Sequence, residues 1–178
     1  MRNALERWGF LDETWLKTNM IKTTGWSPRG NRLIDHSPYG HWQNQTFMAT
    51  LRHDRLDAPW ILDGPINRQL FDCYIKTQLA PTLKAGDVII LDNLSSHKSV
   101  TAKQTLKEIG AWFLFLPPYS PDLNPIEMAF SKLKALMRKA AARTFDDLWK
   151  AVGKVCDLFT DEECFNYIKA AGYVSDLE

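Results

Sequence analysis

The sequence predicts an α/β domain in which helices cover a mixed β-sheet. Three features predict this class: apolar runs at 8–12 and 88–92 that each end in Asp, a third apolar run at 112–116, and a helical pattern through the last third of the chain. Runs that are apolar on both faces are typical of central strands buried between helices. The expected order is three strands, a helix, a strand, a helix, a strand and then helices.

The first strand is expected at residues 8–12, and a hairpin continues from it. Residues 46–54 alternate in part between apolar and polar side chains, and residues 58–64 supply the second half of the hairpin. Partial alternation is typical of a strand that buries one face. The hairpin therefore extends the sheet from the first strand.

Helices are expected on either side of the fourth strand, residues 88–92. Residues 66–83 have apolar side chains at helical spacing. A second helix is expected from Ser96 to Ile109, with Ser95 or Ser96 as its N-cap. The fifth strand, at 112–116, ends at a pair of prolines.

The last third of the chain is expected to be helical. Within 126–140, apolar residues recur at intervals of four, three and four and form one buried stripe: Ile126, Phe130, Leu133 and Met137. A further helix begins after a cap at Thr144, and residues 161–173 supply one more. Four basic residues lie off the buried stripe: Lys132, Lys134, Arg138 and Lys139.

Length and composition indicate one globular domain over residues 1–178, of which 45% are apolar. The 22 basic and 21 acidic residues give a net charge of +1. This charge is too close to zero to indicate a nucleic-acid-binding protein, so evidence for nucleic-acid binding must come from local groups of residues. The three cysteines form neither a metal-ligand spacing nor an even disulfide set. With no signal peptide and no membrane-spanning run, we expect a cytoplasmic protein without a membrane partner.

The segment SPDLNPIE, residues 120–127, places two prolines, an Asp and an Asn before one Glu at a helix start. Helix capping is one interpretation. Asn124 suits the N-cap, Pro125 suits the first helical position, and Glu127 stands where a capping-box Glu folds back. Capping accounts for the position of Glu127, but it does not account for the two other conspicuous acids.

Those acids are Asp12 and Asp92, at the ends of the first and fourth predicted strands. Either one alone is as well explained as a turn or cap residue. If the two strands are neighbours, however, their carboxyl ends open into one crevice, and Glu127 can join the two aspartates there. Such a cluster is costly unless cations neutralise it. Oxygen ligands without Cys or His predict Mg²⁺ or Mn²⁺, and two such ions about 4 Å apart can activate water against a phosphodiester.

Three motifs, FLDET, IILDNLSSHK and LPPYSPDLNPIEMAFSKLK, resemble the catalytic domain of DDE transposases, in particular the mariner-type branch found in bacterial insertion sequences. The resemblance extends from about residue 8 to residue 172, and 34 residues separate Asp92 from Glu127 (127 − 92 − 1), as is characteristic of that branch. It implies a ribonuclease-H-like fold, with a mixed five-stranded sheet, helices on both faces and a helical C-terminal third. It also implies that Asp12 bridges two metal ions, that Asp92 completes one site and that Glu127 completes the other.

The resemblance suggests secondary sites as well. Asn93 and His97 follow Asp92 and are expected to support the metal ligands or contact phosphate. In relatives, a loop between the first two strands clamps the partner subunit across the DNA, and GWSPRGNR (25–32) resembles it, with Trp26 as clamp residue and Arg29 as DNA contact. The basic residues off the apolar stripe form either a solvated helix face or a phosphate-binding surface.

The implied function is metal-dependent cleavage of DNA at transposon ends and strand transfer into target DNA at a TA step, by a homodimer associated with the nucleoid. Family members carry helix-turn-helix modules ahead of this domain, and we expect such a module on a separate subunit or an upstream segment. A second hypothesis is a remnant that only binds DNA or dimerises. A third is a phosphoryl-aspartate enzyme, which would have a second Asp where the sequence has Thr14.

Overall fold

The computed structural model describes residues 5–36 and 44–174. Its centre is a five-stranded sheet in the order β3-β2-β1-β4-β5. The strands are β1 (Trp8–Lys17), β2 (Asn44–Leu51), β3 (Leu56–Asp63), β4 (Val88–Leu91) and β5 (Trp112–Phe115). The first three strands pair antiparallel, whereas β4 is parallel to β1 and β5 is parallel to β4. The predicted mixed five-stranded sheet and its order of elements are confirmed.

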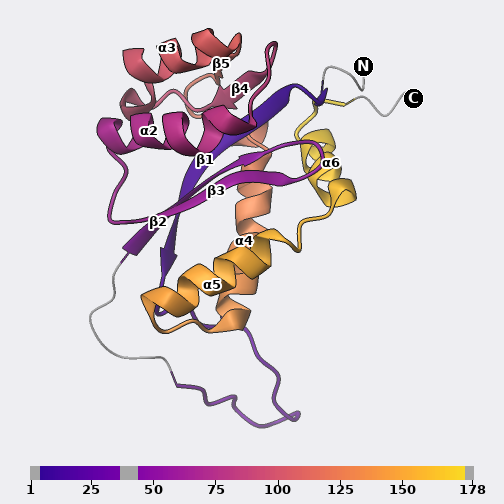
Figure 1. Cartoon of the computed structure of the whole chain (residues 1–178). Helices are drawn as coiled ribbons and strands as arrows, with labels where there is room; N and C mark the ends of the chain where they lie inside the picture. Colours follow the sequence, from indigo (N-terminus) through magenta and orange to yellow (C-terminus); the bar gives the residue numbers. More distant parts are fainter. Residues whose placement is uncertain (1–4, 37–43, 175–178) are drawn as a thin grey trace.

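Helices cover both faces of this sheet (Figure 1). They are α2 (Arg68–Tyr74), α3 (Val100–Ile109), α4 (Ile126–Ala140), α5 (Phe145–Cys156) and α6 (Asp161–Ala170). A π-helical turn, Ile75–Leu79, continues α2. The predicted helical last third is therefore also confirmed. No helix in the described ranges is long and apolar enough to cross a lipid bilayer.

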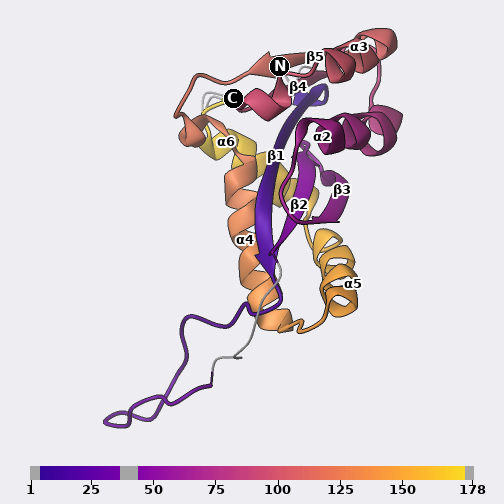
Figure 2. The same ribbon diagram turned by 90° about the vertical axis from the view of Figure 1, so that its left-hand side faces the viewer.

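Alternation along the central strands produces two separate cores. Phe10 of β1 and Ile90 of β4 belong to the core that includes the apolar stripe of α4. Leu11, one residue further along β1, belongs to the core beneath α2 and α3. Figure 2 shows β1 running between α4 and α2. Neighbouring residues of β1 therefore face different helices, which matters for the polar residues that follow Leu11.

The sequence pattern indicated that the first strand ends at Asp12, but in the structure the strand is longer. It continues to Lys17 because Phe10–Lys17 pairs with β2, whereas pairing with β4 stops at Leu11 opposite Leu91. Asp12 is therefore the first β1 residue beyond the parallel ladder. Asp92 follows the last residue of β4 directly, as predicted.

The helix expected from Ser96 also begins later. A short 3₁₀ turn covers Ser95–His97, and α3 starts at Val100 with Ser99 as its side-chain cap. The buried His97 side chain is held by carboxylates on two other segments, which keeps this stretch out of the helix.

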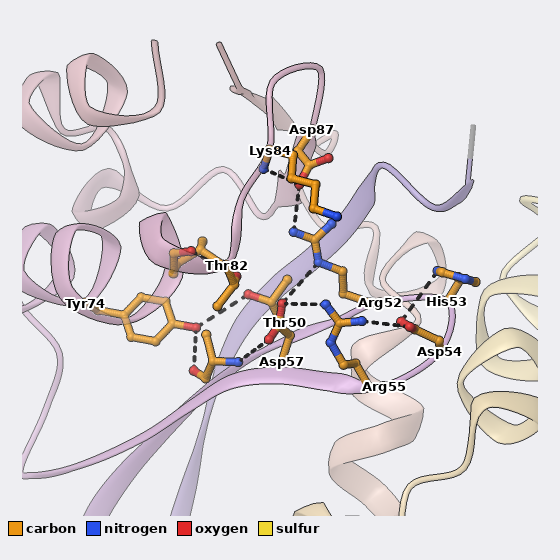
Figure 3. Close-up of polar contacts among 12 residues, drawn as sticks. Thr50, Arg52, His53, Asp54, Arg55, Asp57, Tyr74, Thr82, Lys84 and Asp87 are labelled. Carbon is orange, nitrogen blue, oxygen red and sulfur yellow. Dashed lines mark hydrogen bonds and ion pairs between the residues drawn. The ribbon is translucent and has the colours of Figure 1, made fainter. Parts of the chain in front are cut away.

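A buried arginine ties together the strand ends opposite Asp92 (Figure 3). Arg52, 4% exposed, directly follows β2 and pairs with Asp57 of β3 at 3.3 Å and with Asp87, just before β4, at 3.0 Å. The backbone N–H of Lys84 donates to the same Asp87 carboxylate, at 3.1 Å. Since these groups come from three chain segments, the network holds the adjoining ends of β2, β3 and β4 in place relative to one another.

Residues 19–36, here called the arm, connect β1 toward β2 without helix or strand. Figures 1 and 2 show the arm reaching away from the helices and the sheet. At its root, the guanidinium of Arg143 donates to the carbonyls of Thr18 (3.2 Å) and Met20 (3.0 Å). The arm is thus anchored beside the C-terminal end of α4.

Candidate active site

A pocket of about 370 Å³ lies where the parallel strands end, and all three predicted acids, Asp12, Asp92 and Glu127, line it. The remaining lining residues come from the segments after β4 and β5: Asn93, Leu94, Leu116, Pro117, Pro118, Tyr119, Ser120, Pro121 and Asn124. The fold therefore brings together three carboxylates that are separated by 80 and 35 positions in sequence (92 − 12 and 127 − 92).

Asp12 is the most buried of the three acids, with 8% exposure. Its Oδ1 accepts a hydrogen bond from the N–H of Glu13 (2.7 Å), and its Oδ2 accepts one from Nδ2 of Asn124 (2.8 Å). Burial raises the pKa of Asp12 to about 8, and the negative charges of Glu13, Glu127 and Asp92 contribute to the rise. The ionised form is therefore unfavourable here until a cation neutralises it.

Asp92 is held by His97. Its Oδ1 lies 2.6 Å from Nδ1 of His97, while Nε2 of the same ring lies 3.1 Å from Oε2 of Glu13. The ring is buried and stacks on Phe71 at 4.8 Å between centroids. Both nitrogens can donate to carboxylates only in the imidazolium form. Burial lowers the pKa of His97, but the hydrogen bonds to Asp92 and Glu13 outweigh it and raise the pKa to about 9.

Glu127 stands in the first turn of α4 with an exposed side chain. The helix cap is Pro125, which has no side-chain capping bond, so the capping-box interpretation is wrong. The reason is that Asn124 directs its amide to Asp12 instead of to the helix. Within the described part of the chain, the Glu127 carboxylate has no hydrogen-bond or ion-pair partner, so it remains available to a ligand in the pocket.

The donor set fits hard divalent cations, because it consists of carboxylate oxygens without sulfur or imidazole facing the pocket. Across residues 5–36 and 44–174, no three His, Cys, Asp or Glu side chains lie close enough to bind one ion together. A two-ion arrangement does not need such a group. Each ion would take two carboxylates, with Asp12 shared, and Mg²⁺ commonly keeps its other positions for water and substrate phosphate.

The predicted secondary residues divide into different environments. Asn93 is exposed on the pocket wall, where it can meet a ligand. His97 has no exposed side-chain surface, and its ring nitrogens contact Asp92 and Glu13 instead of facing the pocket. Trp26, 99% exposed, and Arg29 lie on the arm, outside the residues that line the pocket.

The four basic residues of α4 do not form one face. The Lys132 ammonium pairs with Glu163 at 2.6 Å, donates to the Leu158 carbonyl at 2.8 Å and lies over the Phe159 ring. It therefore fastens α6 to α4, so the Lys132 ammonium already has partners within the protein, and its contact with DNA stays a prediction. Lys134 and Arg138 follow Glu127 by seven and eleven residues, which places them within about 20° of Glu127 around the helix.

Sequence reasoning missed two residues of the site, Glu13 and Asn124. Glu13 directly follows Asp12, and neighbouring residues of a strand point to opposite faces, so the strand pattern offers no reason to place both at one site. Only the contact with His97 reveals the role of Glu13. Asn124 was noticed, but as a helix cap. The proline that follows suits an N-cap equally well, so no local signal distinguished the two roles, and only the contact with Asp12 reveals the role of Asn124.

Comparison with known proteins identifies a family and similar folds. A family model described as DDE superfamily endonuclease matches residues 7–149. No curated protein sequence matches the chain. Among solved structures, the Mos1 transposase paired-end complex with left transposon end superposes with a TM-score of 0.75 at 16% identity, over 95% of this chain and 53% of that chain.

Two further structures are similar to the chain. The mariner Mos1 paired-end complex with Mg has a TM-score of 0.71 at 18% identity, covering 95% of this chain and 53% of that one. The catalytic domain of Mos1 mariner transposase has a TM-score of 0.61 at 16% identity, covering 94% and 78%. The chain thus spans about half the length of the transposases in the complexes, and the likeness establishes a common fold. Because the family model matches most of its residues, the chain belongs to the DDE superfamily endonucleases.

Proposed function

We propose that this chain is the catalytic domain of a mariner-type transposase, which cleaves DNA at transposon ends and joins the freed 3′ end to target DNA. The observation that carries the proposal is the meeting of Asp12, Asp92 and Glu127 in one pocket of a DDE-family chain. The similar Mos1 structures include paired-end and strand-transfer complexes and complexes with Mg and Mn, which supports the same chemistry here.

In this proposal Asp12, Asp92 and Glu127 would hold two Mg²⁺ or Mn²⁺ ions, with Asp12 contributing to both sites, Asp92 to one and Glu127 to the other. When bound, such ions would supply activation of the oxygen nucleophile and stabilisation of the leaving oxygen of the phosphodiester. His97 holds Asp92 at a fixed orientation through its hydrogen bond. Proline-rich backbone on either side of Tyr119 forms one wall of the pocket, which in this proposal would border the DNA strand.

The DNA backbone is proposed to follow α4 from the pocket toward the arm. Lys134 and Arg138 stand in line with Glu127, about 10 Å and 16 Å further along the helix axis at 1.5 Å per residue. Lys139 is exposed at the same end of the helix, and Arg29 extends the positive charge onto the arm. Phosphate contacts of this kind position DNA without reading its sequence.

The arm is proposed to reach a second subunit of a homodimer, with Trp26 as the clamp. A fully exposed Trp on an extended arm has no partner within the described residues, and Trp is favoured at protein interfaces. Recognition of the transposon ends is assigned to a helix-turn-helix module on a separate subunit or an upstream segment. Target choice is assigned to TA steps, and the setting to an insertion sequence in the bacterial nucleoid.

The test is strand cleavage by the purified chain on supercoiled DNA that carries candidate transposon ends. We expect nicking with Mn²⁺ or Mg²⁺ and none with EDTA or Ca²⁺, and we expect 3′-hydroxyl products that become joined to target DNA. DNA binding without nicking under all metal conditions would contradict the proposal and would favour a remnant that only binds DNA or dimerises.

A further inference from the structure

Asn124 combines two features that are unusual for one side chain. It is 4% exposed, and its Nδ2 donates to Oδ2 of Asp12 at 2.8 Å. Its Oδ1 is also buried, yet it has no hydrogen-bond partner among the described residues. In the ionised form that a bound cation would favour, Asp12 can only accept, so the amide nitrogen faces Asp12 and the amide oxygen is the unpaired group. A buried unpaired oxygen costs stability, so stability does not explain this residue.

The backbone holds Asn124 in place from both sides. Pro125 disfavours the helical conformation for the residue before it, and Asn124 accordingly has φ −111° and ψ 90°. Its N–H donates to the Pro121 carbonyl at 3.0 Å, and its carbonyl accepts from the Glu127 N–H at 3.1 Å. The hydroxyl of Tyr173 donates to the neighbouring Leu123 carbonyl at 2.7 Å. The side chain is therefore presented to Asp12 by a braced turn.

We propose that Asn124 is a positioning residue that fixes the Asp12 carboxylate for metal binding, an inference that rests on the proposed function. The N–H of Glu13 holds one oxygen of Asp12 and the amide of Asn124 holds the other. Two donors on two oxygens fix the plane of the carboxylate and leave each oxygen free lone pairs for a cation. Ligating carboxylates depend on such hydrogen bonds for their orientation, and losing one typically weakens metal binding 10- to 100-fold.

An amide suits this place better than the alternatives. A second carboxylate would repel Asp12, and an apolar side chain would leave Oδ2 of Asp12 without its donor. The same motif also supplies Glu127 three residues later. The turn therefore delivers one ligand and the support of another, which accounts for the two prolines around Asn124.

The test compares Asn124→Leu, which removes donor and acceptor at similar volume, with Asn67→Leu. Asn67 is a matched control because its side chain does cap a helix, accepting from the Leu70 N–H at 2.9 Å. For Asn124→Leu we expect Tm without metal to change by no more than about 2 °C, because removal of the unpaired amide oxygen offsets the donor lost to Asp12. We expect Mn²⁺ affinity to weaken by about 10- to 100-fold. For Asn67→Leu we expect Tm to fall by about 2–4 °C and Mn²⁺ affinity to stay unchanged. Mn²⁺ binding is measured by electron paramagnetic resonance, independently of cleavage.

Asn124→Ala accompanies the leucine variant, since it removes the donor without any risk of overpacking. Wild-type Mn²⁺ affinity in either folded variant overturns the positioning role, and so does a fall in Tm without a fall in affinity. Failure of the proposed function gives a different result. In that case the wild-type chain binds Mn²⁺ no better than Asp12→Asn, whereas failure of the Asn124 inference alone leaves the difference between wild type and Asp12→Asn intact.

Discussion

Nδ1 of His97 lies 2.6 Å from Oδ1 of Asp92, and the other nitrogen of the ring lies 3.1 Å from Glu13. One imidazolium thus links a predicted metal ligand at the end of β4 to a carboxylate on β1. The link spans the two central strands at the point where their pairing ends.

His97→Gln should lower stability in a pH-dependent way. The pKa of His97 is raised from 6.5 to about 9, so its contribution to stability is complete below pH 6.5 and is lost as pH rises through about 9. The difference in Tm between wild type and variant should therefore be largest near pH 6 and should shrink toward pH 9. Thermal unfolding without metal at three pH values measures it, and a difference that grows with pH would contradict the assignment.

Asp12→Asn should stabilise the metal-free protein at neutral and higher pH. The pKa of Asp12 is raised from 3.8 to about 8, so the folded state binds the proton more tightly than the unfolded state, and wild-type stability falls as pH rises through that window. The variant lacks this fall. It should also lack the rise in Tm that Mn²⁺ gives the wild type, because the shared ligand is gone. Equal pH slopes for the two proteins would show that Asp12 is not the titrating group.

Arg52→Ala should lower the free energy of unfolding by about 3–5 kcal/mol, because it leaves buried carboxylates without their cation. Arg55→Ala is the matched control. Arg55 is 51% exposed and also pairs with Asp57, so its loss should cost about 0–1 kcal/mol. Urea unfolding of both variants measures the contrast. Similar losses in the two variants would mean that the buried network does not hold the strand ends.

Lys134→Ala and Arg138→Ala should each weaken DNA binding. Each should also reduce the slope of log affinity against log salt concentration by about one, because one phosphate contact is lost. Lys132→Ala should instead lower stability and leave DNA affinity nearly unchanged, since its ammonium is paired with Glu163. Titrations of a short duplex at several salt concentrations, beside thermal unfolding, separate the two roles. A reduced salt slope for Lys132→Ala would place that lysine on the DNA path.

Patterns in the sequence predicted the sheet and the order of its elements, because these depend on local periodicity. The three acids stood out beside apolar runs and at a helix start, and they line one pocket although β1 continues past Asp12. The partners of those acids could not be predicted in the same way. Asn124 contacts Asp12 across 112 positions, and His97 contacts Glu13 across 84. The helical pattern places Lys132 off the buried stripe of α4, and only the packing of α6 shows that its ammonium pairs with Glu163. Such contacts depend on tertiary packing, which the periodicity of a single segment does not reveal.

Glu127→Gln gives the most direct test of the catalytic role of the three acids. The change keeps the size of an exposed side chain and removes its charge, so Tm without metal should move by no more than about 2 °C. Mn²⁺-dependent nicking of supercoiled DNA should fall at least about 100-fold, since a lost ligand costs at least as much as a lost supporting contact. A Glu127→Gln protein that folds normally and nicks DNA at the wild-type rate would contradict the account.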